Sequence, residues 1–167
     1  MSWSEPRRAL LAASAAWAGT LLAGCGFQLR QPPRLSFANI SLVGFAPRSP
    51  MAEELRRQLA LQVRVLDDPA KAAVVLKALE DVREKSIVAS TSSAQVRELQ
   101  LRLRLHFRAD TPGCRELIAR AELLVVRDLS YTETAALAKE YEETELFRDL
   151  QADVVNQVLR RLASVQV

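Results

Sequence analysis

The stretch that decides the fold reads Leu99-Gln100-Leu101-Arg102-Leu103-Arg104-Leu105-His106-Phe107-Arg108. Apolar and polar side chains alternate strictly along it, which is the period of a β-strand with one dry and one polar face. The dry face is predicted to carry Leu99, Leu101, Leu103, Leu105 and Phe107. The opposite face is predicted to be basic, with Arg102, Arg104 and Arg108. Such a strand must bury its dry face against a second layer.

The residues that follow predict a second strand antiparallel to the first. Asp110-Thr111-Pro112-Gly113 has the composition of a tight turn. The returning segment, 115–127, places Leu117, Ala119, Ala121, Leu123 and Val125 on one side. We therefore expect a long hairpin over 95–127, in which the small alanines leave room for a helix against the sheet.

Upstream of this hairpin, the sequence predicts one strand and one helix. Residues 39–43 alternate polar and apolar side chains, which indicates a first strand. Ser49 followed by Pro50 is typical of a helix N-cap and first helical position. A helix is predicted from Pro50 to about Gln62, with Met51, Leu55 and Leu59 as its buried stripe.

The segment between this helix and the hairpin is ambiguous. Residues 63–66 form a short β-branched stretch, and Asp67-Asp68-Pro69 turns the chain. In 70–88, the alanine and lysine content favours a helix, whereas Val74-Val75 and Ile87-Val88 favour a strand. We interpret most of it as a strand. The small polar residues 89–93 are predicted to form a mobile loop.

The C-terminal part predicts a second amphipathic helix over about 142–163. Its apolar positions step by three or four residues: Phe147, Leu150, Val154, Val158 and Leu162. Two one-sided helices and a sheet with one dry face predict an α+β fold. We expect a two-layer sandwich with two helices on one face of a four-stranded mixed sheet, in the order β-α-β-β-β-α. Residues 37–165 are predicted to form a single domain.

The N-terminal residues indicate export and lipidation. Arg7 and Arg8 precede a 14-residue stretch without charge, 9–22, which is the layout of a secretory signal peptide and is too short to span a bilayer. Leu22-Ala23-Gly24-Cys25 resembles the bacterial lipobox, whose cysteine is lipidated and becomes the first mature residue. We therefore predict removal of residues 1–24 and a lipid on Cys25. The alternative is an ordinary exported protein whose signal happens to contain a cysteine.

The residues after Cys25 suit a membrane-tethered domain. Residues 25–36 contain Pro32-Pro33 and are predicted to form an extended tether. Gly26 stands where an aspartate is typical of retention in the inner membrane, which favours the outer membrane, periplasmic side. Removal of 1–24 leaves 21 basic and 19 acidic residues, a net charge of +2 that does not suggest a nucleic-acid partner. Lipidation of Cys25 leaves Cys114 without a disulfide partner in the chain.

Candidates for catalysis are scarce. The single histidine, His106, lies among arginines with no evident carboxylate to orient it. The cysteines and the histidine do not have metal-ligand spacing, and the five glycines do not form a phosphate-binding loop. We therefore predict a non-enzymatic binding or assembly protein without metal, whose only cofactor is the lipid on Cys25.

Four motifs, in order, resemble the LptE family of lipopolysaccharide-assembly lipoproteins. They are Cys25-Gly-Phe-Gln-Leu-Arg30, Val96-Arg-Glu-Leu99, Arg127-Asp-Leu-Ser-Tyr131 and Ala136-Leu-Ala-Lys-Glu140, the last before an amphipathic helix. The resemblance implies two helices against a four-stranded sheet. It also implies a lipid-anchored outer-membrane protein that binds lipopolysaccharide and plugs the β-barrel of LptD, through which lipopolysaccharide reaches the cell surface.

The resemblance carries over to few residues. Cys25 matches the lipid anchor, and Lys139 matches a candidate contact for lipopolysaccharide, which we expect to act with Arg127 and Arg97. The family's basic residue in the loop before the long strand is missing, since 89–93 holds only small polar residues and alanine. The arginine-bearing face of 99–108 is expected to face the barrel lumen or plain solvent.

Two alternatives remain open at this point. Lys139 could be a solvated lysine that pairs with Glu143 at a spacing of four. The whole protein could be a structural envelope lipoprotein that does not bind lipopolysaccharide.

Overall fold

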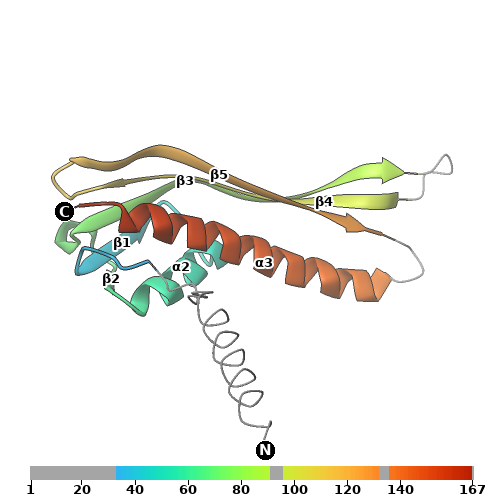
Figure 1. The fold of residues 1–167 in the computed structure, drawn as a ribbon, viewed down its shortest axis with the longest axis horizontal. Coiled ribbons are helices and arrows are strands. Elements are labelled where there is room, and N and C mark those ends of the chain that lie inside the picture. Colours follow the sequence, from blue (N-terminus) through green and yellow to red (C-terminus); the bar gives the residue numbers. More distant parts are fainter. Residues whose placement is uncertain (1–32, 91–95, 132–135, 167) are drawn as a thin grey trace, which may run out of the picture. The chain divides into compact units, whose positions relative to one another are not determined.

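The computed structural model describes residues 33–90, 96–131 and 136–166. The predicted signal peptide, Cys25, and residues 91–93 of the predicted loop lie outside these ranges. The first two residues of that predicted loop, Ala89 and Ser90, instead end a strand. The elements, in chain order, are β1 (Asn39–Val43), α2 (Pro50–Ala60), β2 (Arg64–Leu66), a 3-10 turn (Pro69–Lys71), β3 (Val74–Ser90), β4 (Val96–Asp110), β5 (Glu116–Ser130) and α3 (Ala136–Ala163). The fold is α+β, as predicted, with both helices on one face of a mixed sheet (Figure 1).

The sheet has five strands in the order β2-β1-β3-β4-β5, not the four predicted. The additional strand is β2, which pairs in parallel with β1 and places Val65 opposite Ile40. The chain order is therefore β-α-β-β-β-β-α. A three-residue strand is too short to show the two-residue alternation that identified the others, so only its pairing with β1 reveals it.

The ambiguous segment 70–88 is a strand from Val74 onward, as predicted. A 3-10 turn precedes it, and the Asp68 side chain caps that turn by accepting a hydrogen bond from the Ala70 N–H at 3.0 Å. β3 pairs in parallel with β1 and antiparallel with β4. This pairing on both edges overrides the helix propensity of its alanines and lysines.

The predicted dry face of β4 is confirmed. Its five apolar side chains are all buried: Leu99, Leu101, Leu103, Leu105 and Phe107. α2 buries the predicted stripe of Met51, Leu55 and Leu59. α3 buries Phe147, Leu150, Val154, Val158 and Leu162, and it begins six residues earlier than its predicted start at 142. The core lies between this helix layer and one face of the sheet.

A bulge in β5 changes the predicted face of that strand. Ala121 is opposite Phe107, and Ile118 is opposite Ala109. Between these two pairs β5 contains one more residue than β4. An extra residue reverses which side chains face the core. Consequently Ile118 packs against the core and Ala119 is exposed, contrary to the expected alternation. A second register shift follows, and Leu117 packs against the core as predicted.

A bulge between Ala78 and Glu80 has the same effect on β3. Before the bulge, alternate side chains up to Ala78 are buried in the core. Beyond it, the helix-facing positions fall on Asp81, Arg83, Lys85 and Ile87, opposite the buried leucines of β4. Most of these positions are charged, so the second half of β3 turns a polar strip toward the helix layer.

The helix layer covers the sheet unevenly. α2 has 11 residues and α3 has 28, which corresponds to about 16 Å and about 42 Å at 1.5 Å per residue. Among the described helices, only α3 extends to the end of the sheet at which α3 begins (Figure 1). In the described ranges, no helix is both long and apolar enough to cross a membrane.

Candidate functional site

The sheet face opposite the helices carries Arg102, Arg104 and Arg108 of β4, but these arginines do not form a basic surface. Arg104 lies 3.5 Å from Glu84 and 3.9 Å from Glu80, both on β3. Arg108 Nε lies 3.0 Å from Asp110 Oδ2 on its own strand. The acidic partners come mainly from a neighbouring strand, so the pattern of β4 alone could not show them.

The row containing Arg102 is linked by hydrogen bonds across two strands. Arg102 Nε donates to Gln100 Oε1 at 2.7 Å, and Gln100 Nε2 donates to Asp128 Oδ1 on β5 at 2.9 Å. Along β4 the outer sheet face is therefore a network of charged and amide side chains, although Leu124 of β5 is exposed opposite Arg104. We call it the polar ladder, defined by Gln100, Arg102, Arg104, His106 and Arg108 with their partners.

His106 is flanked by two carboxylates, which corrects the expectation that it has no orienting partner. Nδ1 lies 3.1 Å from Glu80 Oε2, and Nε2 lies 3.2 Å from Glu122 Oε1. The second contact lacks hydrogen-bond alignment. Both carboxylates come from neighbouring strands and face His106 only because of the register.

Lys139 is held by local contacts near the start of α3. Its Nζ lies 2.7 Å from Glu142 Oε2 and 3.4 Å from Ser130 Oγ at the end of β5, and its side chain is 17% exposed. The pairing with Glu143 that the sequence suggested does not form. Glu143 instead accepts a hydrogen bond from Lys85 of β3 at 2.9 Å.

Of the other two predicted lipopolysaccharide contacts, Arg97 lies at the same end of the sheet as Lys139, and Arg127 does not. The backbone carbonyl of Arg97 accepts a hydrogen bond from the Tyr131 N–H at 2.8 Å, so Arg97 lies at the same end of the sheet as Ser130. Arg127, by contrast, donates to Asp153 Oδ2 at 3.2 Å. Asp153 lies 14 residues along α3 from Lys139, about 21 Å. Arg127 is therefore directed away from Lys139.

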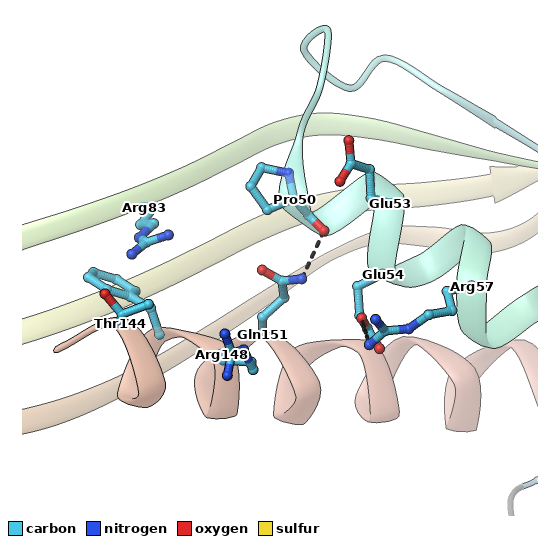
Figure 2. Close-up of a pocket in the computed structure, with 9 residues that line it drawn as sticks. Pro50, Glu53, Glu54, Arg57, Arg83, Thr144, Arg148 and Gln151 are labelled. Atoms are coloured by element: carbon cyan, nitrogen blue, oxygen red, sulfur yellow. Dashed lines mark hydrogen bonds and ion pairs between the residues drawn. The ribbon is translucent and has the colours of Figure 1, made fainter. Parts of the chain in front are cut away.

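Sequence reasoning missed a groove where α2, α3 and β3 meet (Figure 2). Its volume is about 490 Å³, and it is lined by Pro50, Glu53, Glu54, Arg57, Arg83, Thr144, Phe147, Arg148 and Gln151. Gln151 Nε2 of α3 donates to the Pro50 carbonyl at 2.8 Å and ties the two helices together (Figure 2). The groove exists because α2 begins at Pro50 while α3 and β3 continue past it.

Arg83 is the distinctive cation of this groove. Its guanidinium lies over the Phe147 ring, 3.6 Å from the centroid. The other two arginines are paired, Arg57 with Glu54 and Arg148 with Glu145. Within the described part of the chain, Arg83 has no carboxylate within ion-pair distance. One signal in the sequence indicates this polar strip of β3: charged residues become frequent after Ala78.

Residues that could hold a metal are not gathered in the described ranges: no group of three or more His, Cys, Asp or Glu is suitably arranged there. Cys114 is an exposed free thiol at the turn between β4 and β5, with φ of 62°.

Comparison with known proteins identifies the family. The model of the LptE family, described as lipopolysaccharide-assembly, matches residues 37–162, which is nearly the whole described domain. This chain belongs to the LptE family. No match is found among curated proteins. Membership supports a role in lipopolysaccharide assembly, and the family is not one of enzymes.

Solved structures of bacterial lipoproteins share the fold. Uncharacterized lipoprotein B from Nitrosomonas europaea is 29% identical, covers 83% of this chain and 91% of its own, and superposes with a TM-score of 0.71. The rare lipoprotein B from Shewanella oneidensis is 24% identical, with coverages of 75% and 94% and a TM-score of 0.63. A minor lipoprotein from Acinetobacter baumannii is 21% identical, with coverages of 78% and 93% and a TM-score of 0.63.

Proposed function

We propose that this LptE-family chain is an outer-membrane lipoprotein, anchored on the periplasmic side by a lipid on Cys25. In this proposal it binds lipopolysaccharide and plugs an LptD-type β-barrel that delivers lipopolysaccharide to the cell surface. The observation that carries the proposal is the family match over residues 37–162. The lipobox-like Leu22–Cys25 and the fold shared with named lipoproteins support the anchor and the location.

The polar ladder supports the proposed contact with a barrel. The lumen of a large barrel is polar and wet, which suits charged side chains better than an apolar interface would. Arg104 and Arg108 are neutralised by neighbouring carboxylates. A neutralised polar face can enter such a lumen without leaving unpaired charges in it.

A photo-crosslinker in place of Arg104 tests the barrel contact. In cells, it should capture a large outer-membrane protein that mass spectrometry identifies as an LptD-type barrel. The same crosslinker in place of Arg160, which is exposed on α3, is the control for a face other than the polar ladder. Capture of lipid alone, with the protein folded in the outer membrane, would favour the structural envelope lipoprotein.

Lys139→Glu tests the lipopolysaccharide contact. A charge-assisted hydrogen bond to a phosphate is worth about 1.5–3 kcal/mol, so we expect affinity for lipopolysaccharide to fall about tenfold or more. The Lys139 side chain is only 17% exposed and lies beside Glu142, so Lys139→Glu should also lower the unfolding temperature, and Lys139→Gln, which adds no second carboxylate, separates lost binding from lost stability. Lys71→Glu is the control for charge reversal alone, at an exposed lysine that also pairs with a carboxylate three residues away, Asp68. Equal binding by Lys139→Glu and Lys71→Glu would remove Lys139 from the site.

A further inference from the structure

α3 lies over β4 and β5, and two long side chains of β3 reach it at matched spacing. Arg83 lies over the ring of Phe147, and Lys85 Nζ lies 2.9 Å from Glu143 Oε2. Two residues along a strand advance about 6.6 Å, and four residues along a helix advance about 6 Å, so the contacts repeat in step. The next helix-facing residue of β3, Ile87, therefore comes level with the helical turn around Lys139.

One flank of α3 extends from the groove toward the start of this helix. Thr144 and Arg148 line the groove. Leu137 and Tyr141 lie on the same helical flank, because residues three or four apart share a face. Both are strongly exposed, at 84% and 73%, and Ile87, on the helix-facing side of β3, is 62% exposed. Three large apolar side chains thus lie beyond the unpaired Arg83.

We propose that this strip, the β3–α3 trough of Arg83, Lys85, Ile87, Leu137 and Tyr141, binds the lipid A part of lipopolysaccharide. A phosphate would bind Arg83, and acyl chains would cover the apolar residues. The inference rests on the proposed function and adds a second surface to it. Lys139 contacts Ser130 of β5, so Lys139 and Arg83 lie on opposite flanks of α3.

Arg83 is well placed to bind a phosphate. Stacking on Phe147 fixes the guanidinium plane and leaves its N–H edge available for two parallel hydrogen bonds. Lys85 is already bonded to Glu143, so each of them partly neutralises the other. On the opposite wall, Glu53 would repel a phosphate, which confines the anion to the β3 side of the groove.

The apolar half of the trough favours a lipid over a peptide or a soluble anion. Large exposed apolar side chains at one end of a domain indicate a surface that is covered by another molecule. A cation beside such a surface matches a ligand that carries phosphate and hydrocarbon together. Lipid A is that kind of ligand, and anionic phospholipids share the chemistry.

The experiment measures the binding of labelled lipopolysaccharide to the purified mature lipoprotein in detergent. Arg83→Glu should weaken binding about tenfold or more. Arg64→Glu, an exposed strand arginine on β2, is the matched control and should bind as the parent does. Arg83→Gln and Tyr141→Asp should also weaken binding. They replace Arg83→Glu in the test if its thermal unfolding differs from that of the parent.

The outcomes separate this inference from the proposed function. If Lys139→Glu weakens binding and Arg83→Glu behaves like Arg64→Glu, the trough is not a binding surface, although the proposed function stands. If the parent protein does not bind lipopolysaccharide at all, the proposed function fails, and the inference fails with it. Phosphatidylglycerol vesicles should compete poorly; equal competition would overturn the assignment to lipid A.

Discussion

Adding one methyl group at Gly44, directly after β1, should strongly lower the free energy of unfolding. Its φ is +83°, in the left-handed region, and a Cβ there would collide with the backbone carbonyl oxygen of Ala78. We expect Gly44→Ala to lower the free energy of unfolding by about 1–3 kcal/mol from backbone strain alone, with a further cost from the collision. Urea denaturation measures the change.

Gly113 provides the control for this prediction. Its φ lies outside the left-handed region, and the nearest atom to an added Cβ would be Thr111 Oγ1 at 4.0 Å. Gly113→Ala should therefore change the free energy of unfolding by less than about 0.5 kcal/mol. Equal urea midpoints for the two variants would show that the Ala78 carbonyl does not constrain Gly44.

His106 shows how neighbouring strands determine the environment of a single side chain. Along β4 it is preceded and followed by arginines at alternate positions, which predicts a cationic surrounding. In the sheet, its ring nitrogens lie beside Glu80 of β3 and Glu122 of β5. Charges within one strand therefore predict the composition of a face, whereas the register between strands determines which charges meet.

At the scale of elements, bulges decide the faces of β3 and β5. Each bulge inserts one residue, and the side chains beyond it change sides. In β3 the consequence is a charged, helix-facing strip that begins at Asp81. In β5 the consequence is that Ile118 replaces Ala119 at the core. Without the bulges, Arg83 would not face the helix layer.

α3 should tolerate substitutions very differently on its two sides. Leu150 is completely buried against the sheet, and Leu137 is 84% exposed. Leu150→Ala should lower the free energy of unfolding by about 2–5 kcal/mol, because it removes buried methyl groups and leaves a cavity. Leu137→Ala should cost less than about 0.5 kcal/mol. Thermal and urea unfolding of the two variants test this, and similar losses would contradict the packing described for α3.

At the scale of the molecule, the unequal helices produce a one-sided domain. α3 extends along the sheet well beyond the start of α2. One sheet face therefore carries the core and the groove, and the other carries the polar ladder. In the proposed function, the first of these faces would bind lipopolysaccharide and the second would contact the barrel.

Membrane attachment is expected to depend on Cys25 alone. Each buried methylene contributes about 0.8 kcal/mol, and stable anchoring requires more than one acyl chain. Cys25→Ala should therefore yield a soluble or unprocessed protein, which fractionation of cells lacking the barrel partner would detect. Continued recovery of this variant in the outer membrane would show that another surface anchors the chain.

The sequence by itself determined the features that depend on a few neighbouring residues. The alternation over 99–108 predicted the dry face of β4, and Ser49-Pro50 predicted the start of α2. The stripe from Phe147 to Leu162 predicted the buried side of α3. Each pattern is complete within one element, so its period is sufficient to identify it. The family resemblance, too, came from short local motifs.

Only the tertiary structure decided what lies between elements. β2 is recognisable as a strand through its pairing with β1, and the partners of Arg104 follow from the register of β3. The groove unites Arg83 and Phe147, which are 64 residues apart in the chain. Such contacts depend on bulge positions and on the relative lengths of two helices. These are set by packing over the whole domain, so no local period encodes them.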